Sequence, residues 1–133
     1  MQILETAIYA VNLEETARFY ETVLGLERIV SFPERHVFFR LENSVLLIFN
    51  PQSTVLPSRD PKMPVPSHGG IGPGHICFRA SAAEIEQWSR KLSDALIEIE
   101  ADFTWPAGGR SIYFRDPAGN SIEFAEPRIW GFD

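Results

Sequence analysis

Cysteine is nearly absent from this sequence, and long apolar runs are missing. The single cysteine, Cys77, excludes an internal disulfide and fits a reducing compartment, so we expect a cytoplasmic protein. We also expect Cys77 to be a small buried residue of a strand. The longest apolar run, Ser44–Phe49, has the length of a strand, whereas a membrane-spanning helix needs roughly 20 residues. No signal peptide is recognised, and we expect no membrane partner.

Positive charge is also in short supply. Twelve lysines and arginines stand against 18 aspartates and glutamates, which gives a formal net charge of −6. Because no basic stretch is present to neutralise phosphates, we expect no nucleic-acid partner. The 133 residues suffice for one domain, or for two small modules, with a buried core.

The pattern of apolar residues predicts two similar halves, each with a strand, a helix and three further strands. Asn12 and Glu15 are typical of a helix start, as N-cap and capping-box partner, and Ser81 and Glu84 are typical of a second one. Strands are expected, from alternation and from β-branched and aromatic content, at 3–11, 26–32, 36–41, 44–49, 74–80, 97–101, 111–114 and 121–125.

A stretch with six prolines, from Asn50 to Gly74, separates the halves, and no regular interior element is expected in it. We interpret it as a linker or a lid, with His68 as an exposed loop residue. The predicted organisation is a single domain with a first module at 1–51, a linker at 52–73, a second module at 74–127 and a tail at 128–133.

The two halves also match residue by residue. Phe39-Arg40 matches Phe114-Arg115, and Pro51 matches Pro127. Counting four residues back from each proline aligns Leu47 with Glu123. An internal repeat of this kind predicts two copies of one supersecondary unit.

Four equivalent positions follow from this repeat: Glu5, Leu47, His75 and Glu123. Three of the four residues are types that bind metals. A carboxylate such as Glu123 in mid-strand is costly to bury without a partner. Two carboxylates and one imidazole that face each other would be stabilised by a divalent cation, so we predict a metal site at Glu5, His75 and Glu123.

Several motifs resemble those of the vicinal oxygen chelate superfamily, which includes glyoxalase I, the bleomycin-resistance proteins and the extradiol dioxygenases. They are Gly74-His75-Ile76, Tyr113 to Glu123, and the stretches Ala17-Arg18-Phe19-Tyr20 and Leu24-Gly25-Leu26. The resemblance runs from Ile3 to about Pro127. It implies an α+β fold in which two βαβββ modules form a cup-shaped mixed or antiparallel sheet with flanking helices, with metal ligands at the positions of Glu5, His75 and Glu123. It also implies a small-molecule substrate and a homodimer.

Two positions depart from the superfamily pattern. The first ligand is commonly His, sometimes Gln or Glu, and here it is Glu5. The fourth position, which is a carboxylate in glyoxalase I, is Leu47. One divalent ion is expected, and Fe, Mn, Mg, Ni and Zn all remain open; the acidic donor set favours the harder ions.

Further candidates surround the predicted metal. Glu123 and Tyr113 are the catalytic candidates: Glu123 as a carboxylate that can leave the metal and act as a base, and Tyr113 because the resemblance implies a tyrosine at this position that touches substrate. His36, Phe38, Ser111 and Tyr113 are predicted to line the substrate pocket by strand parity and by the repeat. Arg110 is either a ligand for an anionic group or an exposed loop arginine.

Two functions are compatible with these residues. The first is a glyoxalase- or dioxygenase-like metal-dependent enzyme, of the lyase, isomerase or dioxygenase type, that chelates a small oxygenated substrate. The second is a metal-free, bleomycin-resistance-like protein that binds a small molecule. The retained metal-ligand types favour the first, and Leu47 with the non-histidine Glu5 favours the second.

Overall fold

Each half of the chain builds one four-stranded mixed sheet with one main helix. The computed structural model describes residues 1–133, and the chain divides into two compact units, Met1–Gly74 and His75–Asp133. Together they form an α+β structure, as expected from the resemblance. No helix has the length and apolarity needed to cross a membrane.

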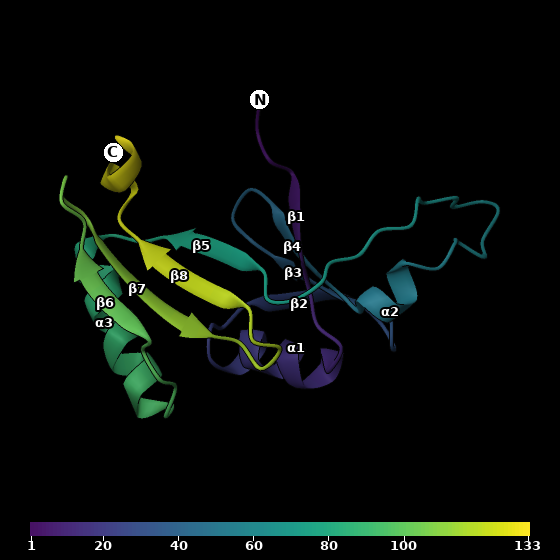
Figure 1. Cartoon of the computed structure of the whole chain (residues 1–133), viewed down its shortest axis with the longest axis horizontal. Coiled ribbons are helices and arrows are strands. Elements are labelled where there is room, and N and C mark those ends of the chain that lie inside the picture. Colours follow the sequence, from purple (N-terminus) through teal and green to yellow (C-terminus); the bar gives the residue numbers. More distant parts are fainter. The chain divides into compact units, whose positions relative to one another are not determined.

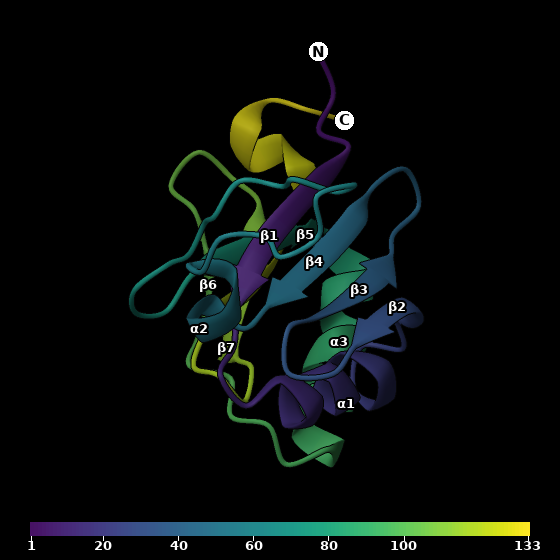
Figure 2. The same ribbon diagram turned by 90° about the vertical axis from the view of Figure 1, so that its right-hand side faces the viewer.

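The first unit places its first and last strands side by side (Figure 2). The sheet order is β1-β4-β3-β2; β1 and β4 run parallel, and the other pairs run antiparallel. The elements are β1 (Glu5–Tyr9), α1 (Leu13–Thr22), β2 (Glu27–Phe32), β3 (His36–Arg40), β4 (Val45–Phe49) and α2 (Pro51–Thr54).

The second unit repeats this topology in the order β5-β8-β7-β6 (Figure 1). Again the first and last strands, β5 and β8, are parallel, and the others are antiparallel. The elements are β5 (His75–Arg79), α3 (Ala82–Asp94), β6 (Ala101–Thr104), β7 (Arg110–Arg115), β8 (Ser121–Ala125) and the 3₁₀ helix η1 (Pro127–Trp130).

Strand alternation decides which side chains each sheet buries under its helix. In the first unit Phe39 is buried, and its ring centroid lies 5.7 Å from that of Tyr20 of α1. In the second unit the ring of Trp88 of α3 stacks on Phe124 of β8 at 4.7 Å. The apolar side of α1 and that of α3 therefore each pack against one face of their sheet. The opposite face of each sheet carries the candidate site residues.

The register of the parallel pairs confirms the residue-level repeat. Residue 5 pairs with 45 and residue 7 with Leu47 in the first unit; His75 pairs with Ser121 and residue 77 with Glu123 in the second. Leu47 and Glu123 therefore occupy the same place in their sheets, one strand away from Glu5 and His75 respectively.

One predicted strand lies later in the chain than expected. The alternating stretch 97–101 was expected to form it, but β6 begins at Ala101. Leu96 adopts a positive φ of 58°, and the Ile97 N–H bonds back to the Leu92 carbonyl at 2.9 Å. The first residues of the alternating stretch therefore belong to the turn that ends α3. Pairing with β7 begins only at Ala101, the last residue of the stretch.

The proline-rich segment contains one regular turn that was not expected. Asn50 caps the short helix α2, its Oδ1 accepting the Gln52 N–H at 3.0 Å, and Pro51 fits the first helical turn, where its missing N–H costs nothing. The helix starts differ too. Ser81 and Glu84 form the predicted capping box of α3, whereas the Asn12 side chain makes no cap hydrogen bond and instead donates to Glu15 at 3.0 Å.

We expect Ser81→Ala to lower the free energy of unfolding by about 1 kcal/mol, because it removes the acceptor for the Glu84 N–H. Urea denaturation followed by circular dichroism measures the loss. Ser93→Ala, which removes an exposed hydroxyl near the other end of α3, is the matched control and should change stability little. Equal losses in both variants would contradict a stabilising capping box.

Candidate functional site

Glu123 is a buried carboxylate in the middle of β8. It is 5% exposed, and it lies between Cys77 of β5 and Tyr113 of β7, its two cross-strand partners. Its Oε1 is buried without a hydrogen-bond partner. Leaving such an oxygen unpaired costs roughly 1–3 kcal/mol, and more when it is charged, so the position points to a group that binds it.

His75 lies on the same face, and its ring is oriented toward Glu123. Nε2 is 3.3 Å from Glu123 Oε2, while Nδ1 is 3.0 Å from the Ser121 carbonyl oxygen. Because a carbonyl only accepts, Nδ1 carries a proton and donates it. The ring thus presents Nε2 to the carboxylate, with its other nitrogen held by the backbone, as is usual for metal-binding histidines.

Tyr113 and Cys77 flank the carboxylate as protonated groups. Burial first, and then the Glu123 carboxylate, raises the pKa of Tyr113 to about 12. Partial burial of the thiol, and then the same carboxylate, raises the pKa of Cys77 to about 12. As a whole residue Cys77 is exposed, whereas it was predicted to be buried. At neutral pH both can donate hydrogen bonds, and Cys77 is a poor nucleophile.

An aromatic row extends from His75 along this face of the second sheet. Tyr113 stacks on His75 at 6.2 Å, and Phe103 lies parallel to Tyr113 at 6.0 Å, within 3°. Trp105 continues the row beside Phe103 at 4.9 Å, and its indole N–H donates to Ser111 Oγ at 2.9 Å. Ser111 and Tyr113 therefore share a face as predicted, while Phe103 and Trp105 were not anticipated.

Arg110 does not join this group. Strand parity places it on the opposite face of β7 from Ser111 and Tyr113, the face that carries α3. Its guanidinium bonds Asp102 at 2.7 Å and Glu86 of α3 at 3.0 Å, and these contacts raise its pKa. Its positive charge is therefore already paired with two carboxylates on the face opposite the candidate site.

In the first unit, the face that carries Glu5 is mostly aromatic. Glu5 is exposed at the start of β1, and Leu47, at the position equivalent to Glu123, is 7% exposed. His36 and Phe38 stack at 4.4 Å on the same face. Within neither unit do three or more histidine, cysteine, aspartate or glutamate side chains gather into a metal-binding group.

Two basic residues of the first unit were not among the predicted site residues. His68 is half-buried rather than exposed, its Nδ1 lying 2.8 Å from the Tyr9 hydroxyl. Arg35 Nη1 lies 2.9 Å from His36 Nδ1. A guanidinium can only donate, so His36 Nδ1 accepts, and the ring is neutral. Burial, and then the charge of Arg35, lowers the pKa of His36.

With the geometry in view, the family can be identified. The sequence profile described as the Glyoxalase/Bleomycin resistance protein/Dioxygenase superfamily matches residues 2–124. The chain belongs to this superfamily. Comparison with curated proteins gave no match.

Solved structures agree with this assignment. A lactoylglutathione lyase from Agrobacterium tumefaciens is 41% identical with a TM-score of 0.91, the match covering 99% of this chain and 98% of that one. A virulence protein from Salmonella typhimurium is 26% identical with a TM-score of 0.68, and the match covers 95% of this chain and 96% of that one. A glyoxalase/bleomycin resistance protein/dioxygenase from Nocardioides shares the fold. It is 22% identical with a TM-score of 0.73, and the match covers 95% of this chain and 83% of that one.

We expect the neutral state of His36 to make stability depend on pH. Since its folded pKa lies below the ordinary 6.5, the unfolded chain binds a proton first as the pH falls. The contribution of His36 is therefore present above about pH 6.5 and is lost as the pH falls through the folded pKa. Urea unfolding between about pH 7.5 and 5.5 should show a steeper loss in the wild type than in His36→Gln. Identical slopes would contradict the lowered pKa.

Proposed function

We propose that this chain is a metal-dependent enzyme of the lyase or isomerase type that acts on a small oxygenated substrate. The observation that carries the proposal is the buried, unpartnered Oε1 of Glu123 beside the oriented Nε2 of His75. A 41% identical relative that spans the whole chain and is described as a lactoylglutathione lyase supports lyase chemistry in particular.

The donor set fits a divalent ion. One imidazole nitrogen and carboxylate oxygens suit Mn, Fe, Ni and Zn, and a second carboxylate would also suit Mg. His75 and Glu123 would hold the ion, and Glu5, which takes the place of His75 in the first unit, is the proposed third ligand. Leu47 offers no donor, so we propose three protein ligands with open positions for substrate oxygens. A bound divalent ion would polarise those oxygens as a Lewis acid.

The protein residues around this pair have separable roles. The Ser121 carbonyl holds the His75 tautomer through Nδ1, which keeps Nε2 directed at Glu123. The Tyr113 hydroxyl stays protonated far above neutral pH, so it can donate a hydrogen bond to an oxygen on which negative charge develops. With one Glu123 oxygen on the ion, the other oxygen of the carboxylate would be the proton acceptor for a substrate carbon or oxygen.

Metal content of tag-free protein is the first test. After reconstitution with each of the five candidate metals, we expect about one divalent ion per chain in the wild type and a loss of at least about tenfold in affinity in Glu123→Gln. Elemental mass spectrometry gives the stoichiometry. Glu100→Gln removes an exposed carboxylate of the same unit, bound to Arg115, and is the matched control that should keep the metal.

No metal after reconstitution would contradict the proposal. That result would favour a metal-free protein that sequesters a small molecule, as in the bleomycin-resistance proteins, with the aromatic faces of the two sheets as its binding surfaces. Metal retained by Glu123→Gln but lost in His75→Ala would instead place the ion on other oxygens.

Glu5 and lyase chemistry are tested together by turnover. We expect the metal-loaded wild type to act on lactoylglutathione, and Glu5→Gln to lose at least about tenfold in kcat/KM along with metal affinity. Steady-state assays on wild type, Glu5→Gln and the exposed control Glu42→Gln measure this. A fully active Glu5→Gln would exclude Glu5 as a ligand, and a metal-loaded but inactive wild type would exclude this substrate.

We also propose that the chain forms a homodimer, which analytical sedimentation tests.

A further inference from the structure

Four polar side chains surround the ring of Phe49 on the sheet face of the first unit. The His68 ring lies edge-on at 4.6 Å, His36 edge-on at 5.8 Å, and Tyr9 at 6.4 Å, measured between ring centroids. The guanidinium carbon of Arg35 lies 5.8 Å from the same centroid. We call these five residues the Phe49 cluster. It combines one permanent positive charge with two imidazoles and a phenol, and it contains no acid.

Arg35 is unusual among the arginines of this acidic chain. Most of the others form ion pairs with aspartate or glutamate, namely Arg18, Arg28, Arg40, Arg90, Arg110, Arg115 and Arg128. Arg35 has no such carboxylate partner; it donates to His36 and lies against Phe49. Because a guanidinium has five N–H donors and His36 takes one of them, the remaining donors can still bind a planar anion.

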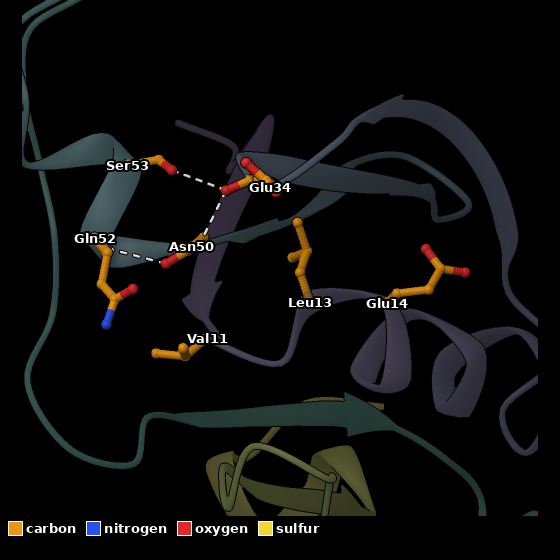
Figure 3. A pocket seen from close by; sticks show the side chains of 7 residues that line it. All are labelled: Val11, Leu13, Glu14, Glu34, Asn50, Gln52 and Ser53. Atoms are coloured by element: carbon orange, nitrogen blue, oxygen red, sulfur yellow. Dashed lines mark hydrogen bonds between the residues drawn. The ribbon is translucent and has the colours of Figure 1, made fainter.

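The turn that presents Arg35 is held firmly. Glu34 adopts a positive φ of 63°, a costly conformation for a residue with a side chain. Its carbonyl oxygen accepts from Asn50 Nδ2 at 3.1 Å and from Ser53 Oγ at 2.8 Å (Figure 3). The Arg35 carbonyl accepts the Asn50 N–H at 2.8 Å. The start of α2 thus fixes the turn, and with it the point from which the Arg35 side chain leaves the backbone.

The same short helix anchors the segment that carries His68. The His68 N–H donates to the Thr54 carbonyl at 2.9 Å. Two glycines follow: a Cβ on Gly70 would lie 2.8 Å from the Tyr9 ring and a Cβ on Gly69 2.7 Å from Val55 Cγ1, so a side chain at either position would require its neighbour to shift. The segment is therefore packed closely enough to hold the imidazole of His68 against Tyr9 and Phe49.

Next to the cluster lies a stack of flat rings. Phe32 stacks on His36 at 5.7 Å, and His36 stacks on Phe38 at 4.4 Å. Phe32 is 58% exposed at the end of β2, so its ring is open to solvent. A planar molecule placed against this stack would bury apolar surface and gain favourable ring contacts.

We propose that the Phe49 cluster binds a planar organic acid, with the carboxylate at Arg35 and its ring against the exposed Phe32, which ends the stack formed with His36 and Phe38. Arg35 supplies a two-pronged contact to the carboxylate, as guanidinium groups do. The Tyr9–His68 pair, joined by its own 2.8 Å hydrogen bond, adds a polar wall beside the ring of Phe49. The site shares His36 with the predicted substrate pocket but uses no metal, so binding to metal-free protein tests it separately from the proposed function.

Benzoate binding to the chelator-treated full chain tests this proposal. We expect benzoate to shift the ring resonances of His36 and His68 in NMR spectra and to give a saturable isotherm. Arg35→Gln should weaken binding at least about tenfold, because it removes the charged donor pair. Arg59→Gln removes an equally unpaired arginine from an exposed loop of the same unit and should change affinity less than twofold.

Two further comparisons keep the proposal falsifiable if Arg35→Gln proves unstable. Benzamide, which has the ring without the charge, and acetate, which has the charge without the ring, should each bind at least about tenfold more weakly than benzoate. Phe32→Ala should weaken benzoate binding and leave acetate binding unchanged. Benzoate shifts that survive Arg35→Gln, or equal losses in Arg35→Gln and Arg59→Gln, would overturn the proposal, as would benzamide binding as tightly as benzoate.

Discussion

The parallel pairing of the first and last strands in each unit decides which side chains can act together. In each sheet an antiparallel strand lies beside this pair, β3 beside β4 in the first unit and β7 beside β8 in the second. Side chains from three strands therefore meet on one face. A slip by one residue would send every one of these side chains to the face that packs against the helix. The buried apolar residues Ile8, Ile122 and Phe124 on that other face oppose such a slip, and they thereby hold the register of the site residues.

One frame carries two different chemistries. At the position where the second unit has Glu123, the first has Leu47, and the cross-strand neighbour is Phe38 where the second unit has Tyr113. The first unit thus offers rings and a guanidinium without a carboxylate partner, whereas the second offers a carboxylate, an imidazole and protonated donors. Because the backbone register is the same, this difference arises from side chains alone, as is common when one fold serves several functions.

Much of this arrangement could be predicted from the sequence, because the repeat is visible in it. Counting from Pro51 and Pro127 aligned Leu47 with Glu123, and the observed register agrees. The proline-rich segment was harder. The one turn of helix α2 depends on the cap from Asn50, and the position of His68 depends on a hydrogen bond to Tyr9, 59 residues away. Contacts of that span leave no periodic signal in a sequence.

The direction of side chains that do not belong to the repeat was the second feature that the sequence could not predict. Arg110 was a candidate because it follows two glycines, yet its direction is set by Asp102 and Glu86, whose proximity depends on how α3 packs. Trp105 gave no signal because it lies in a loop, although its bond to Ser111 extends the aromatic row.

The cost of burying Glu123 is the strongest physical reason to regard the second unit as functional. A leucine at this place would pack without loss, as Leu47 does in the first unit, and an unpaired buried carboxylate oxygen is destabilising. Its neighbours Tyr113 and Cys77 stay protonated at neutral pH, because burial and then the carboxylate raise the pKa of each to about 12. A positive group bound beside Glu123, as proposed above, would offset this cost. The first unit, which has an apolar residue at the equivalent place, does not carry this cost, so the cost is not a requirement of the fold.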